Sequence, residues 1–253
     1  INIANRIPLT ETYSCTELSD RRILVTGDKF IKVFSLDTYE EIQDIHSDSW
    51  NMYSLVIPDR DMIFITTQKG LFQYSLTNFR LVTLHGPRSY IDHLAYLKSK
   101  DTVLFSNRSK LLSLDLSSST VTTFNDQHEN EILIIVLTSD EKFVFTTGMD
   151  NTLNQLSTDS WSVVRSVDLE SMGRSLLINE ETRTILVGMI DGSLAEHSLN
   201  DLSLMRTVEV HTRWIKHIIQ LSSGDVLTCS YDGRICLPFH DTVPIEVSDK
   251  NIC

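Results

Sequence analysis

The sequence repeats one short pattern six times: two β-rich runs joined by a tight polar turn. The runs Arg22–Gly27 and Phe30–Leu36 flank the first of these turns. Asp-Gly and Lys-Gly are favoured in two-residue hairpin turns because glycine accepts positive φ angles. So regular a repeat predicts a chain built from equivalent antiparallel units. The turns begin at Asp28, Lys69, Arg108, Asp150, Asp191 and Asp232, in steps of 41, 39, 42, 41 and 41 residues.

Each repeat has two further strand-like runs, one before the hairpin and one after it. In the fourth repeat these runs are residues 131–138 and 162–169. We therefore expect four short antiparallel strands per unit and almost no helix, since no segment keeps a 3.6-residue apolar period. The run ILIIVL at 132–137 is apolar on both faces, as in a sheet covered on both sides. Four-stranded sheets repeated at this period predict an all-β protein, a β-propeller.

Counting strands predicts six blade equivalents in a single domain over residues 1–253. Residues 1–9 resemble an outermost strand and are predicted to close the last unit beside 234–239, which removes an exposed sheet edge. Residues 241–253 are a tail or a competing outer strand, and a seventh blade from further chain is the alternative. The predicted units are approximately 10–49, 50–89, 90–129, 130–170, 171–211 and 212–240.

The repeat resembles that of the WD-repeat family, and the resemblance extends over nearly the whole chain. That family places a histidine before the innermost strand and an aspartate in the hairpin turn. The Trp-Asp pair that names the family is absent, and Phe34 and Tyr74 stand where Trp would be. The resemblance implies a propeller in which the histidines form structural hydrogen bonds near the turns. The matching residues are His46, His85, His128, His211, Asp150, Asp191 and Asp232.

Charge and hydropathy exclude two classes of partner. Lys and Arg number 22 against 34 Asp and Glu, which gives a net charge of −12. A duplex-binding surface needs clustered cations, so we expect no nucleic-acid partner. The longest apolar run, Ile132–Leu137, is far too short to cross a bilayer, and no membrane partner is expected. The chain opens at Ile1, which favours a processed chain or part of a longer protein.

The four cysteines favour an intracellular, cytoplasmic protein with packed thiols. No two of them form a CxxC pair, which argues against a zinc knuckle or a redox motif. Four cysteines in 253 residues are also too few for a disulfide scaffold. A two-residue turn would place Cys229 and Cys236 opposite each other, in a hydrogen-bonded pair that suits a disulfide poorly.

The sequence favours a protein without catalysis, metal or cofactor. It has no nucleophile elbow, no phosphate-cradling loop and no HExxH motif. Acid pairs such as Asp140 and Glu141 fall at equivalent turns, where solvated residues are expected. The enzymatic alternative is a channel site around His93 and His217, which occupy the same position in two innermost strands. Such a site needs a third ligand.

Aromatic and cationic residues gather in the loops that enter the innermost strands. The resemblance implies that these loops contact partners, and Trp, Tyr and Arg dominate interface energies. We therefore predict a protein-interaction scaffold that binds a protein or peptide of acidic character, within a larger complex. The alternative is a structural module held permanently in an assembly. The predicted partner-binding residues are Trp50, Arg88, Tyr90, Arg174, Arg213 and Trp214.

Overall fold

The computed structural model describes residues 12–18, 21–85, 91, 93–124, 127–239 and 245–246, apart from the side chains at positions 46, 48, 245 and 246. The chain divides into two compact units, Ile1–Leu94 and Ala95–Cys253. Within the described ranges the only helical segments are two 3-10 turns, η1 (Pro58–Arg60) and η2 (Lys98–Lys100). The predicted all-β class is therefore confirmed.

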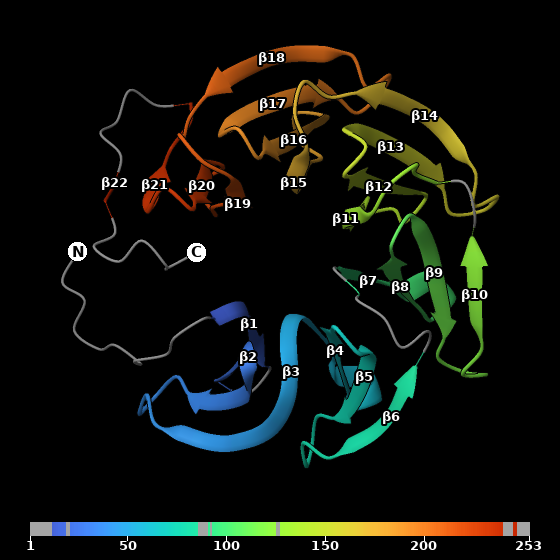
Figure 1. The fold of residues 1–253 in the computed structure, drawn as a ribbon, viewed down its shortest axis with the longest axis vertical. Coiled ribbons are helices and arrows are strands. Elements are labelled where there is room, and N and C mark those ends of the chain that lie inside the picture. The colour runs from blue at the N-terminus through green and yellow to red at the C-terminus, as the bar shows by residue number, and fades with distance from the viewer. Residues whose placement is uncertain are drawn as a thin grey trace. The chain divides into compact units, whose positions relative to one another are not determined.

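The strands of the first unit are hydrogen-bonded in the order β1 to β6, and the long strand β3 pairs with β2 on one side and β4 on the other. β2 folds back on itself at Asp28 and Lys29, where Lys29 has a φ of 59°. The two ends of β2 therefore meet, and Leu36 N donates a hydrogen bond to Arg21 O at 2.8 Å. β3 then pairs first with β2 and later with β4, as Figure 1 shows. The strands are β1 (Thr12–Leu18), β2 (Arg22–Ser35), β3 (Glu41–Ile57), β4 (Met62–Thr67), β5 (Gly70–Ser75) and β6 (Leu81–His85).

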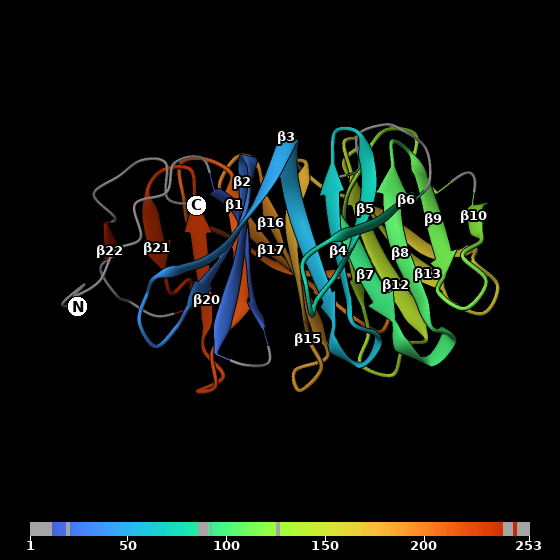
Figure 2. The ribbon, with the colours of Figure 1, turned by 90° about the horizontal axis from the view of Figure 1, so that it is seen from below.

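The second unit contains four sheets of four consecutive antiparallel strands (Figure 2). The first two sheets are β7 (Leu94–Leu97), β8 (Thr102–Asn107), β9 (Lys110–Asp115), β10 (Val121–Phe124), and β11 (Ile132–Leu137), β12 (Phe143–Gly148), β13 (Thr152–Ser157), β14 (Val163–Asp168). The last two are β15 (Gly173–Asn179), β16 (Thr184–Met189), β17 (Ser193–Ser198), β18 (Leu204–Glu209), and β19 (Ile215–Gln220), β20 (Val226–Ser230), β21 (Arg234–Cys236), β22 (Ile245–Glu246).

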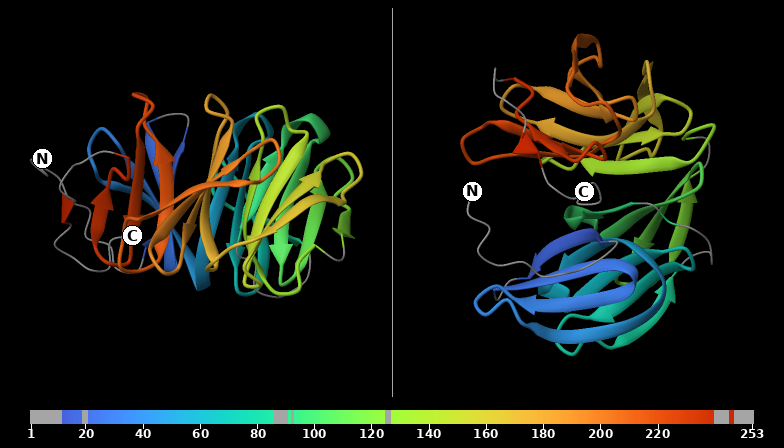
Figure 3. Two further views of the ribbon diagram at one scale, coloured as in Figure 1. Left: turned by 90° about the horizontal axis from the view of Figure 1, so that it is seen from above. Right: turned by 60° about the vertical axis from the view of Figure 1, so that its left-hand side comes forward.

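The hydrophobic core of the second unit lies between successive sheets, which are stacked face to face (Figure 3). Leu104 of β8 packs with Ile135 of β11 in one cluster. Phe145 of β12 packs with Leu176 of β15 in the next, and Leu186 of β16 belongs to a third. One four-stranded sheet cannot cover both of its apolar faces, so each sheet depends on its neighbours for burial.

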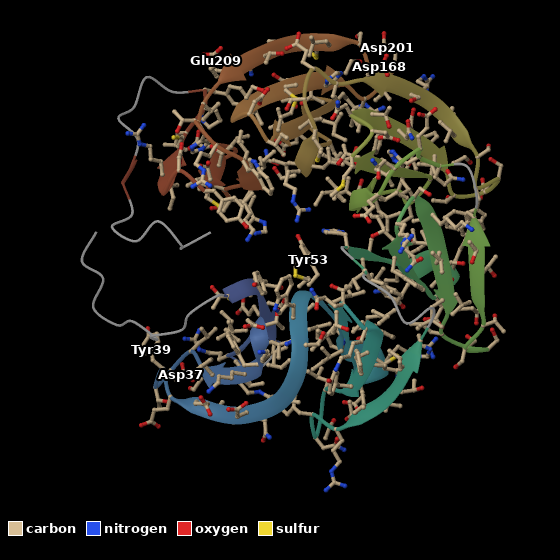
Figure 4. All side chains as sticks on the ribbon, viewed as in Figure 1. Asp37, Tyr39, Tyr53, Asp168, Asp201 and Glu209 are labelled. Atoms are coloured by element: carbon tan, nitrogen blue, oxygen red, sulfur yellow. The ribbon has the colours of Figure 1, made fainter. Side chains whose placement is uncertain are left out.

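The fourth strand of each complete sheet is far more exposed than the first. β14 and β18 are exposed at nearly every position, whereas β11 is buried along most of its length. Asp168 marks the end of β14 and Glu209 the end of β18 in Figure 4. The first strands pack against one another instead, since β15 contacts both β11 and β19. The start of each first strand is therefore a fixed position on a rigid core.

The hairpin loops of the last three repeats have three residues, which corrects the prediction of two. Cys229 pairs with Ile235 and Thr228 with Cys236, so the two cysteines are not opposite each other. Both are free thiols. The third loop residue has a positive φ, 79° at Gly233, which is the geometry of a type I turn followed by a left-handed residue. An aspartate thus stands in the middle of each of these loops.

β22 occupies the edge of the last sheet. Ile235 pairs with Ile245, and Arg234 with Glu246. The sequence offered this segment as a competing outer strand. Residues 1–9, the main candidate for closing the last unit, lie outside the described residues, so that assignment and the single-domain division remain predictions. No helix in the described part of the chain is long and apolar enough to cross a membrane.

The stacking of sheets is tested at Gly188, where β16 meets the next sheet. A Cβ at this position would overlap the Ser175 hydroxyl and lie 2.6 Å from Cγ2 of Ile215. We expect Gly188→Ala to lower the free energy of unfolding by about 1–3 kcal/mol, because the packed backbone cannot yield freely. Ser166→Ala on exposed β14 is the control and should change it by less than about 0.5 kcal/mol. Urea denaturation measures both, and an unchanged midpoint for Gly188→Ala would contradict the packing.

Candidate partner-binding site

A buried hydrogen-bond network joins the histidine and the turn aspartate of the fourth repeat. His128 Nδ1 lies 3.0 Å from both carboxylate oxygens of Asp150, and His128 Nε2 lies 2.8 Å from Thr146 Oγ1. Desolvation by burial lowers the pKa of His128, although Asp150 acts in the opposite direction. The ring is therefore neutral at pH 7, and Nδ1–H donates to the carboxylate while Nε2 accepts from the threonine hydroxyl.

The last repeat has the same network, and it fixes the loop that precedes β19. His211 Nδ1 lies 3.0 Å from Asp232 Oδ2, and His211 Nε2 lies 3.0 Å from Thr228 Oγ1. The same aspartate accepts a hydrogen bond from Thr212 N at 3.1 Å and one from Arg234 N at 3.0 Å. One carboxylate thus holds both the hairpin turn and the backbone immediately before Arg213.

The other repeats depart from this arrangement. His85 Nε2 lies 2.6 Å from Gln73 Oε1, and none of the described aspartates bonds this ring. Asp191 accepts hydrogen bonds from Ser193 N and Oγ, and buried Leu169 stands where the histidine would be. The side chain of His46 is outside the described part of the structure. The structure therefore brings a predicted histidine and aspartate together in two repeats, the fourth and the sixth.

Three residues of the loop and hairpin around β19 form a cation–aromatic cluster. The side chain of Trp214 is 44 % exposed, and its ring meets the edge of Tyr231 with centroids 5.6 Å apart. The Arg213 guanidinium lies 6.0 Å from the Tyr231 centroid and donates a hydrogen bond to Tyr231 O at 3.3 Å. Trp214 therefore contacts Tyr231 while part of its surface remains open to solvent.

β-bulges at equivalent places in β15 and β19 add two more cations. In β15 the pairing shifts between Gly173 and Ser175, which leaves Arg174 as the extra residue. In β19 it shifts between Ile215 and His217, which leaves Lys216 as the extra residue. A bulge changes the direction of its side chain, and bulges are frequent beside functional sites. Lys216 Nζ lies 4.8 Å from the Tyr231 centroid, so it joins the same cluster.

The lowered pKa of His217 shows that two of these cations lie near the same ring. Its pKa is lowered to about 4, by desolvation first and then by the positive charges of Lys216 and Arg174. Arg174 on β15 and Lys216 on β19 therefore act on the same imidazole, and β15 packs against β19. The last two sheets of the second unit hold Arg174, Arg213, Trp214, Lys216, His217 and Tyr231 together, and we call this group the β19 cluster.

Sequence reasoning found four members of the β19 cluster and missed two as partner-binding residues. Arg174, Arg213 and Trp214 were predicted to bind a partner, and His217 was considered for a metal site. Lys216 and Tyr231 were missed because a bulge and a ring contact depend on backbone geometry. The one local signal for Tyr231 was the Asp232-Gly233 turn that follows it, because this turn predicts a hairpin. The hairpin places Tyr231 beside Trp214, at the start of β19.

The remaining predicted partner-binding residues belong to the first unit. Trp50 lies within β3, opposite Asp28, and is 44 % exposed. Arg88 and Tyr90 lie outside the described residues. Each unit thus presents one exposed tryptophan at the entry to a first strand, Trp50 in the first unit and Trp214 in the second.

His93 does not form a metal site with the described residues. It is 7 % exposed, and its ring lies 4.1 Å from that of Tyr53, which Figure 4 labels on β3. Among the residues that the structure describes, no group of three His, Cys, Asp or Glu side chains could hold a metal ion.

A cavity of about 490 Å³ opens at the other ends of β15 and β19 from the β19 cluster. It lies between the turns that follow these strands, and its polar lining includes Glu180, Glu181 and Ser223. Glu180 already accepts hydrogen bonds from Ser139 N and Oγ of the preceding sheet. The cavity lacks the aromatic side chains that anchor partners, so the β19 cluster is the better candidate site.

Comparison with known proteins identifies the fold. No protein-family model matches the sequence, and no curated protein matches it. A chain from a crystal structure titled "Crystal Structure of Mitotic Checkpoint Complex" matches with a TM-score of 0.78 at 15 % identity, over 88 % of this chain and 72 % of that chain. The protein has the β-propeller fold, built from four-stranded antiparallel blades. Similar matches extend to 1679 chains, so the propeller fold alone does not select one function.

The structural role of the His128–Asp150 pair is tested against a matched turn. Asp150 accepts hydrogen bonds from the backbone N–H and the hydroxyl of Thr152, and Asp191 accepts the same two from Ser193. Of these two aspartates, Asp150 is the one that also hydrogen-bonds a histidine. We expect Asp150→Ala to lower the free energy of unfolding by about 1–3 kcal/mol more than Asp191→Ala. Equal losses in chemical denaturation would show that the buried histidine adds nothing.

Acid should weaken the fold through His217. Between its ordinary pKa near 6.5 and the lowered value of about 4, the unfolded chain binds a proton that the folded chain does not. The free energy of unfolding therefore falls as the pH drops through this window, with His217 contributing up to about 3 kcal/mol. His217→Asn should flatten the decline between pH 7 and pH 4.5, and the remainder comes from other groups whose pKa is lowered, such as His85, His128 and Glu141. An identical pH dependence in the variant would rule out this origin.

Proposed function

We propose that the protein is a non-catalytic interaction scaffold that binds a partner protein or peptide through the loops entering the first strands of its blades. The observation that carries this proposal is the exposure of Trp214 beside Arg213 on a loop held by Asp232. A rigid aromatic side chain loses little conformational freedom on binding, and Trp and Arg supply most hot-spot energy in interfaces.

The charge of the β19 cluster favours an acidic partner. The chain as a whole carries a net charge of −12, yet this cluster holds two arginines and a lysine. Local positive charge on an acidic protein steers acidic segments to one place and disfavours general association with anions. The free thiols Cys15, Cys229 and Cys236 suit the reducing intracellular setting proposed for this interaction.

A second candidate function is a module built permanently into an assembly, and the exposed fourth strands favour it. β6, β14 and β18 each expose two consecutive apolar residues at equivalent positions. Contiguous exposed apolar surface often marks an interface. The similar propeller chain comes from a structure whose title names a complex, which accords with either function. The exposed residues are Leu81, Val82, Val163, Val164, Leu204 and Met205.

The loop proposal is tested by recovery of partners from cell extract. We expect a Trp50/Tyr90/Trp214 triple-alanine variant to lose its partners, because truncating a single anchor costs about 2 kcal/mol or more. The matched control is a Leu81/Val163/Leu204 triple-alanine variant, which removes exposed apolar side chains from three fourth strands. Circular dichroism and thermal unfolding establish that both variants are folded.

The two triple variants separate the two candidate functions. Loss of partners by the loop variant alone supports the scaffold. Loss by the fourth-strand variant alone supports the permanent module, and a folded loop variant that recovers the same partners contradicts the loop proposal.

A further inference from the structure

Arg174 is a partly buried cation with no counter-ion among the described residues. It makes no hydrogen bond or ion pair with any residue that the structure describes, and its side chain is only partly accessible to solvent. Other arginines of the second unit are engaged: Arg165 donates to Gln155 at 2.8 Å and Arg206 to Glu196 at 2.6 Å. A charged group that is partly removed from water and left unpaired favours binding of an opposite charge from outside.

Two further cations lie in the same cluster. Lys216 lies over the Tyr231 ring at 4.8 Å, and Arg213 lies 6.0 Å from the centroid of that ring. Arg213 forms no ion pair in the described part of the chain. Equivalent bulges in β15 and β19 place Arg174 and Lys216, so the backbone of two packed strands fixes the cations. Preorganised charge of this kind binds an anion without reorganising the protein.

The carboxylate of Asp232, in the same hairpin as Tyr231, is held by hydrogen bonds within the fold. Asp232 accepts hydrogen bonds from His211, Thr212 and Arg234, and these bonds hold it at the hairpin turn. His211 and Asp232 are almost fully buried in their side chains, at 0 % and 6 % exposure. Asp232 is therefore held at the turn, and neither Arg174 nor Arg213 forms an ion pair with it in the described part of the chain.

We propose that the β19 cluster recognises a phosphorylated side chain of a partner peptide, with an apolar side chain of the same peptide lying against Trp214. This inference rests on the proposed interaction function and names the chemistry of its ligand. A phosphorylated residue carries close to two negative charges and three acceptor oxygens, whereas a glutamate carries one charge and two oxygens. Two arginines and a lysine match the larger charge, and guanidinium groups bind phosphate through paired hydrogen bonds.

The geometry also assigns a role to each member of the cluster. Arg174 is the anion-binding residue, since nothing else among the described residues occupies its donors. Lys216 adds a second positive charge that acts on the same imidazole, and neutral His217 offers a ring nitrogen without a competing negative charge. Trp214 is half exposed and supplies the apolar contact beside the charge. The site therefore reads an anion and an adjacent apolar side chain together.

The test uses the full chain and libraries of short peptides with one fixed position flanked by randomised residues. Separate libraries fix phosphoserine, phosphothreonine, phosphotyrosine, serine, threonine, tyrosine or glutamate at that position. We expect at least one phosphorylated library to be retained about tenfold or more above its unphosphorylated counterpart and above the glutamate library. Equal retention of phosphorylated, glutamate and uncharged peptides, or no retention of any phosphorylated peptide, would overturn the proposal.

Variants locate the binding to the cluster. For peptides selected from the retained library, Arg174→Ala should weaken binding about tenfold or more, and Arg174→Lys should lose less. Arg165→Ala on exposed β14 is the matched control and should leave binding unchanged. Equal affinities for Arg174→Ala and the unaltered protein, with both folded by circular dichroism, would overturn the assignment.

The outcomes distinguish this inference from the proposed function. If the aromatic triple variant loses its cellular partners while Arg174→Ala retains them, the scaffold function stands and phosphate recognition fails. If phosphatase treatment of the extract releases the partners from the unaltered protein, the phosphate is part of what is recognised. Partners that survive phosphatase treatment and also bind Arg174→Ala contradict the inference.

Discussion

Burial between successive sheets is the constraint on which the rest of the structure depends. The run Ile132–Leu137 is apolar on both faces, so it is stable only when a second sheet covers each face. Side chains such as Phe145 reach 0 % exposure in these layers, and at Gly188 the layers approach so closely that a methyl group would collide with Ile215. Because interiors are close-packed, this stacking fixes where each first strand begins. Function can then be placed on the short loops that enter those strands.

The buried His211–Asp232 pair fixes the position of the loop before β19 relative to the stacked sheets. Asp232 bonds His211 within its own blade and Thr212 in the loop before β19, so the backbone leading to Arg213 and Trp214 is held at a fixed point. The imidazole of His211 and the carboxylate of Asp232 are both buried, so either group would lose a hydrogen-bond partner without the other. In the fourth repeat, burial lowers the pKa of His128, so this histidine also contributes to the loss of stability in acid.

Much of this could be predicted from the sequence, and the remainder could not for identifiable reasons. Apolar alternation and turn residues located the strands, and the repeat spacing located His128 opposite Asp150. The three-residue loops were not predicted, because a left-handed φ at Asn151 is a property of the turn and asparagine does not require it. The shared strand β3 was also missed, since its middle is polar and resembles a loop. The bulges that place Arg174 and Lys216 arise from the pairing of backbones, which sequence patterns do not reveal.

The central claim is that a partner lies on the β19 cluster and the loop held by Asp232. Hydrogen–deuterium exchange of the full chain, alone and bound to its cellular partner, tests it most directly. Binding should slow exchange at residues 212–217 and 173–175 and leave the exposed fourth strands β14 and β18 unchanged. Protection confined to β14 and β18, with residues 212–217 exchanging as in the free protein, would contradict it.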